Sequence, residues 1–123
     1  MTITVRAATA NDAAFLAQTD LIATRSHVEW GFLDVALPGP ESRRIRYLEL
    51  MAVAEPRCWN HYTNFLVAEL DGTPGAALCG VTAGPHIVTD LIATLPGVRN
   101  EMGLSDEEFA AGEERAKSVV GHA

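Results

Sequence analysis

Residues 64–81 constrain the fold of this chain more than any other segment. Two apolar runs with strand propensity flank the pair Asp71-Gly72. An Asp-Gly pair in this setting is the strongest short-range signal for a β-hairpin, because both residues tolerate the positive φ angles of a tight turn. The segment therefore predicts two antiparallel strands, near residues 64–70 and 75–83.

Length and composition predict one globular domain. The 123 residues contain no apolar run near the roughly 20 residues of a membrane span, and a chain of this length buries about two thirds of its unfolded surface. The N-terminal residues do not form a secretory signal, so we expect a cytoplasmic location. With 9 Lys and Arg against 16 Asp and Glu, the net charge of −7 disfavours nucleic acids and anionic membranes as partners.

The segment before the hairpin predicts one strand and two helices. Polar and apolar residues alternate over 2–6, as in a strand. Thr9 and Asp12 have the spacing of a capping box, and a helix is expected from there to about residue 25. Residues 26–40 predict a helix-to-helix connection, and residues 41–54 have the apolar stripe of a second amphipathic helix.

Beyond residue 84 the periodicity is helical again. Residues 87–95 place apolar side chains on one helical face, and Pro96-Gly97 is expected to stop that helix. Ser105 predicts the cap of a final helix that runs to about Val120. The fold class is therefore α+β: a short antiparallel sheet formed by a strand and a hairpin, followed by C-terminal helices.

The order strand, helix, helix, hairpin resembles the opening of the GNAT-type N-acetyltransferases. The likeness covers residues 3 to about 82 and rests on Val5-Arg6-Ala7-Ala8-Thr9 with Asp12, on Leu66-Val67-Ala68-Glu69, and on Asp71-Gly72 followed by Gly75 to Gly80. It implies that residues 1–84 form a GNAT-like N-terminal half. Residues 85–123 would be a helical insertion or C-terminal extension of the same domain.

The resemblance also implies acetyl-CoA as co-substrate. In that family a strand leads into a loop Arg/Gln-x-x-Gly-x-Gly/Ala that holds the pyrophosphate. This loop is not intact here; its nearest candidates are Asn100, Gly103 and Ser105, with residues 90–96 as the preceding strand. The alternative makes residues 85–121 a helical insertion, which leaves this chain, natural or truncated, without its cofactor half.

The implied function is acyl transfer from acetyl-CoA to an amine of a small molecule or peptide, with this chain supplying mainly the acceptor-binding half. The family builds its acceptor side largely from the connection between the first two helices, where Glu29, Trp30 and Asp34 lie. The acids would bind a cationic amine and the indole would supply a cation–π wall. The alternative places Trp30 and Phe32 in the core and both acids in solvent.

No metal site is expected, because the four His and two Cys residues do not have a zinc-binding spacing. The strand near 75–83 would leave unpaired backbone groups at a sheet edge. We expect the C-terminal helices, a second copy of the chain or a separate polypeptide to cover this edge. The alternative function is accordingly a non-catalytic α+β binding or dimerisation module.

Overall fold

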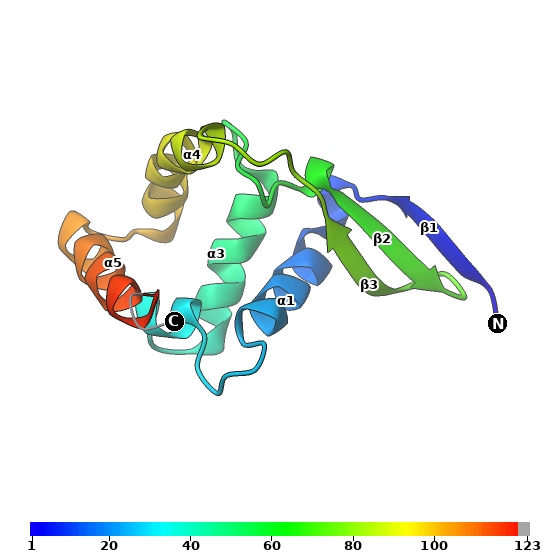
Figure 1. Cartoon of the computed structure of the whole chain (residues 1–123), viewed down its shortest axis with the longest axis horizontal. Helices are drawn as coiled ribbons and strands as arrows, with labels where there is room; N and C mark the ends of the chain where they lie inside the picture. Colours follow the sequence, from blue (N-terminus) through cyan, green and yellow to red (C-terminus); the bar gives the residue numbers. More distant parts are fainter. Residues whose placement is uncertain (121–123) are drawn as a thin grey trace.

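The computed structural model describes residues 1–120 as an α+β fold with helices on one side of a three-stranded sheet (Figure 1). The sheet has the antiparallel order β1-β2-β3. Its strands are β1 (Ile3–Ala7), β2 (Phe65–Leu70) and β3 (Thr73–Cys79). The helices are α1 (Ala13–Thr24), α2 (Phe32–Ala36), α3 (Glu41–Val53), α4 (His86–Met102) and α5 (Asp106–Val120), with short 3-10 turns at Ala10–Asp12 and Tyr62–Asn64. The predicted fold class is confirmed.

The predicted hairpin is present, with Asp71 at φ 50° and Gly72 at φ 84° in its turn. The second strand starts and ends earlier than predicted, at residues 73 and 79 instead of 75 and 83. The amide of Gly80 donates the last bond of this ladder, to Asn64 O at 2.9 Å. The chain then leaves the sheet towards α4, so residues 80–83 do not extend the strand.

The inner face of the sheet packs on α1. Leu16 of α1 meets Phe65 and Val67 of β2 in one buried cluster. Further from the sheet, Leu21 of α1 packs with Leu48 of α3. Helix α1 therefore lies between the sheet and α3, and the apolar stripe predicted for residues 41–54 packs on α1.

Two features of the helical layer differ from the sequence-based expectation. The connection at residues 26–40 contains the five-residue helix α2, whose first turn is stabilised by a bond from Gly31 N–H to the Asp34 carboxylate at 2.8 Å. The predicted stop at Pro96 is wrong, because α4 continues to Met102. Pro96 is exposed, while Val98 and Met102 pack into the core, and this packing outweighs the lost backbone bond.

The outer face of the sheet is apolar and uncovered. Register pairs Ile3 with Leu70 and Leu66 with Leu78 on this face, and Val5 lies between them. These five side chains are 46% to 69% exposed. Within residues 1–120, β1 and β3 each pair only with β2, so both edges of the sheet are open. None of the helices described is long and apolar enough to cross a membrane.

Candidate functional site

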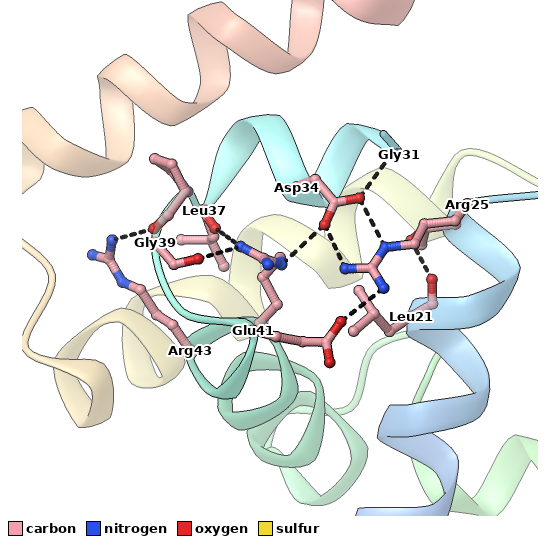
Figure 2. Close-up of polar contacts among 11 residues, drawn as sticks. Leu21, Arg25, Gly31, Asp34, Leu37, Gly39, Glu41 and Arg43 are labelled. Carbon is pink, nitrogen blue, oxygen red and sulfur yellow. Dashed lines mark hydrogen bonds and ion pairs between the residues drawn. The ribbon is translucent and has the colours of Figure 1, made fainter. Parts of the chain in front are cut away.

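Asp34, predicted to bind an amine, is already saturated with partners (Figure 2). Its carboxylate accepts from Arg25 at 2.7 and 3.0 Å, and Arg44 Nε lies 3.1 Å away. Arg25 also binds Glu41 at 2.7 Å. Hydrogen bonding to Arg25 holds the pKa of Asp34 below its usual value, despite the opposing effect of burial. This carboxylate joins α1, α2 and α3 and has no free oxygen to offer a ligand.

Glu29 and Trp30 lie on the exposed loop before α2 and are not brought to the Asp34 carboxylate. Trp30 is 64% exposed, and Asp34 is buried. The alternative expectation is wrong for Trp30 and Phe32, which are not in the core, and for Asp34, which is buried. It is correct for Glu29, which is exposed. The three predicted acceptor residues do not form one site in this structure.

The three cofactor candidates lie in a helix-to-helix turn. Asn100 is in the last turn of α4, Gly103 ends that helix with φ 69°, and Ser105 Oγ accepts from Glu108 N–H at 3.1 Å at the start of α5. The amides of Gly103 and Leu104 bond to the end of α4. Residues 90–96 are helical and not a strand, as the insertion alternative expected.

This turn does not fit a pyrophosphate. The amides of residues 103, 104 and 108 are occupied by helix-capping bonds, so a phosphate could not use them. Three acids, Asp106, Glu107 and Glu108, occupy the first turn of α5 and would repel the anion. We therefore assign no cofactor contact to residues 100–105.

The structure instead contains an apolar cavity of about 500 Å³ beneath the sheet. This volume lies within the range of small-molecule sites. All but the first strand and the last helix contribute to its walls: Thr19, Asp20, Ala23 and Thr24 of α1, Phe32 and Leu33 of α2, Tyr47, Leu48 and Met51 of α3, Trp59 and Asn60 of the following loop, Phe65 of β2, Ala77 and Cys79 of β3, and Leu91 of α4.

Asp20 is the acidic residue of this cavity. In the part of the chain that the structure describes, its carboxylate has no hydrogen-bond or ion-pair partner. Burial alone raises its pKa from 3.8 to about 6, because the apolar surroundings disfavour the charged form. A carboxylate without a partner in such surroundings is costly unless a cation or donor is supplied from outside the chain.

Two further polar groups line the same cavity. Asn60 is 3% exposed, and its Oδ1 has no hydrogen-bond partner among residues 1–120. The Cys79 thiol donates to Trp59 O at 3.5 Å, and burial, with a smaller effect from the Asp20 charge, raises its pKa. Asp20 and Asn60 both offer oxygen acceptors, so the cavity favours a ligand that donates hydrogen bonds from an apolar body.

The position of Asp20 in the sequence contains a signal for this site, although helical periodicity alone does not show whether the carboxylate has a partner. Asp20 lies on the apolar stripe of α1, three residues after Ala17 and four after Leu16, both fully buried. An acid on a stripe that faces the core is unusual and points to a site or a partner. Whether Asp20 finds a partner depends on the side chains that α2, α4 and the loop after α3 place around it, and these elements come from other parts of the chain.

Comparison with protein-family models, with curated proteins and with solved structures finds no match to this chain. No cluster of three or more potential metal ligands is found within the described residues. The chemistry of the site therefore rests on its own geometry.

Proposed function

We propose that this chain binds the amine acceptor of an N-acetyltransferase, acts in the cytoplasm, and uses the cavity around Asp20 as its acceptor site. The observation that carries the proposal is an unpaired carboxylate in an apolar cavity of small-molecule size. An ammonium group beside Asp20 would supply the missing counter-charge. The resemblance of residues 3–82 to GNAT-type enzymes gives the reaction class.

The carboxylate suits both binding and proton removal. An amine bound as ammonium must lose a proton before its nitrogen lone pair can attack an acyl group. Asp20, with a pKa of about 6, is ionised at neutral pH and is a closer match to the operating pH than an ordinary Asp. The walls formed by Leu48, Met51 and Phe65 give this exchange apolar surroundings.

Acetyl-CoA remains the proposed acyl donor, but the proposal assigns this chain the acceptor side alone. The turn at residues 100–105 does not fit the pyrophosphate, for the reasons given above. Calorimetric titration of the chain with acetyl-CoA is expected to show no saturable binding. Saturable binding in the micromolar range would contradict this division of roles.

The amine site is tested with hexylamine and its neutral counterpart hexanol. Quenching of Trp59, which lines the cavity, or calorimetry reports binding. We expect hexylamine to bind more tightly than hexanol and its affinity to rise about tenfold from pH 5 to pH 7.5, as Asp20 ionises. Tyr47 and Cys79, the other titratable wall residues, have raised pKa values and stay neutral in this range.

Asp20→Asn is expected to lower hexylamine affinity at pH 7.5 at least tenfold and to leave hexanol binding intact. Glu107→Gln is the matched control, because it removes one exposed acid of α5 that makes no bond to another side chain. Equal binding of hexylamine to wild type and Asp20→Asn would show that the carboxylate is not the amine site.

The second candidate is a binding or dimerisation module, favoured by the exposed apolar face of the sheet. Five large apolar side chains on that face exceed what isolated surface residues explain. Among the residues that the structure describes, nothing pairs with either sheet edge, including the one near residues 75–83 where we expected a partner. The mass of the chain in solution, measured by sedimentation, tests dimerisation: a stable dimer supports it and a monomer at all concentrations contradicts it.

A further inference from the structure

We infer that the amine carries a long apolar chain, which extends from the Asp20 cavity into a second cavity between α2, α4 and α5. This inference rests on the proposed function and names the substrate class of the same site. Two observations carry it. The second cavity, of about 240 Å³, is apolar, and it shares four wall residues, Phe32, Leu33, Tyr47 and Leu91, with the first.

The shared residues place the two cavities next to each other. Phe32 and Leu33 belong to α2, Tyr47 to α3 and Leu91 to α4, so side chains of these three helices line both spaces. The polar acceptors Asp20 and Asn60 belong only to the first cavity. A ligand that spans both spaces would therefore place its amine at the sheet end and its apolar part at the α5 end.

The outer wall of the second cavity is held in place by specific contacts. Gly112 lets α5 approach α2 closely, since a Cβ at this position would lie 2.5 Å from Ala36 O. Arg115 Nε then donates to Val35 O at 2.8 Å at the end of α2. The space between α2 and α5 is thus bounded by packed helices and is suited to a ligand of defined cross-section.

The charges around the second cavity do not provide a site for another head group. Of its two acids, Glu108 binds Arg43 at 3.0 Å and Glu113 is exposed on α5. The remaining walls are apolar and include Leu95, Leu104 and Ala116. Apolar walls gain by burying methylene groups and gain nothing from a second charge. The fitting occupant is therefore a linear primary alkylamine.

The experiment compares butylamine, octylamine and dodecylamine, each below its micelle-forming concentration, by calorimetry with the full chain. Burial of methylene groups predicts a gain of about fourfold in affinity per methylene added, for as long as the growing chain enters the second cavity. We expect dodecylamine to bind at least a hundredfold more tightly than butylamine. An affinity independent of chain length would overturn the inference.

Ala116→Phe places a large side chain in the second cavity without touching the first. It should leave butylamine binding unchanged and weaken dodecylamine binding at least tenfold. Ala110→Phe is the matched control, because Ala110 is an exposed residue of the same helix and lines neither cavity. Leu95→Trp fills the space from α4 and serves as a second blocking variant if Ala116→Phe does not fold, as judged by circular dichroism.

The outcomes separate the two proposals. If butylamine and dodecylamine both fail to bind, the amine site itself is wrong. If all three amines bind and require Asp20, but neither blocking variant discriminates between them, the amine site stands and the extended-chain inference is wrong. A loss of dodecylamine binding confined to the blocking variants supports both proposals.

Discussion

Two carboxylates in the helical layer, Asp34 and Asp20, show how partners decide the role of a buried acid. Asp34 is bound by Arg25, Arg44 and a backbone amide, and the pKa of its carboxyl is lowered. Asp20 lines a cavity and has no hydrogen-bond or ion-pair partner among residues 1–120, and the pKa of its carboxyl is raised to about 6. Burial acts in the same direction on both. The first acid is satisfied within the fold, and for the second we propose that a ligand supplies the partner.

The largest effect is expected from Asp34→Ala. Removing this carboxylate leaves the buried Arg44 and the half-buried Arg25 without their shared counter-charge, which costs about 3–5 kcal/mol of unfolding free energy. Urea denaturation at pH 7 measures the loss. Glu41→Gln removes only an exposed partner of Arg25 and should cost less than about 1 kcal/mol. Equal losses of unfolding free energy in the two variants would contradict the expectation that the buried Asp34 contributes more to stability than the exposed Glu41.

The pH dependence of the Asp34 contribution follows from its lowered pKa. The unfolded state takes up a proton near pH 3.8, before the folded state does. The stabilisation is therefore complete above this value and is lost as the pH falls through the folded pKa. The difference between wild type and Asp34→Ala should shrink in acid, and a constant difference from pH 7 to pH 2 would contradict this account.

Gly112→Ala tests how much the close packing of α5 on α2 contributes to stability. The added methyl would meet Ala36 O and push α5 away from α2, the helix that carries both Asp34 and the cavity wall residue Phe32. We expect a loss of about 1–3 kcal/mol in unfolding free energy. Gly97→Ala is the matched control in α4, where a Cβ meets open space, and should be neutral or stabilising.

Asp20→Asn should stabilise the chain in the absence of ligand. At pH 7.5 the wild type carries an ionised Asp20 in apolar surroundings, and the partly exposed site leaves a gain of about 1–2 kcal/mol for the amide. The raised pKa determines the direction of this pH effect. Below pH 3.8 Asp20 is protonated in the folded and the unfolded state and does not reduce the free energy of unfolding. As the pH rises from 3.8 through about 6, the unfolded state loses the proton first, and the free energy of unfolding falls. Thermal unfolding at pH 3.5 and pH 7.5 should show a gain only at the higher pH.

The smallest effect on stability is expected on the outer face of the sheet. Leu78→Lys changes the most exposed of its five large apolar side chains and should alter unfolding free energy by less than about 0.5 kcal/mol. Sedimentation velocity should nevertheless show weaker self-association than in wild type. Ala110→Lys, at an exposed position of α5, is the control that adds the same charge elsewhere. An equal effect of Ala110→Lys on self-association would rule out the sheet face as the site of self-association.

Local signals predicted much of the secondary structure. The Asp71-Gly72 turn, the bond from Thr9 N–H to Asp12 at 2.8 Å and the capping of α5 by Ser105 each depend on neighbours within a few residues. The course of α4 through Pro96 was missed, because it depends on packing against α3. Tertiary packing overrides a helix-breaking signal of this kind.

The candidate site was predicted less well than the fold. Asp34 was predicted to bind a ligand because nothing in the sequence indicated that Arg44 would be its partner. Arg44 belongs to the amphipathic helix expected at residues 41–54, and in the structure both residues are buried and form an ion pair. Asp20 was only included in the helix expected up to about residue 25. Whether an acid is satisfied depends on groups that the fold brings from other elements, and no spacing along the chain reports this.

The exposed face and open edges of the sheet have a consequence for how this protein must be handled. Unpaired strands beside bare leucine and isoleucine side chains template intermolecular β-structure. A sample kept concentrated, warm or in high salt should therefore lose material as fibrous or amorphous precipitate long before its helices melt. We therefore expect the sheet to limit how long a concentrated sample stays in solution, and we expect a mild detergent or a partner that covers the sheet to extend that time.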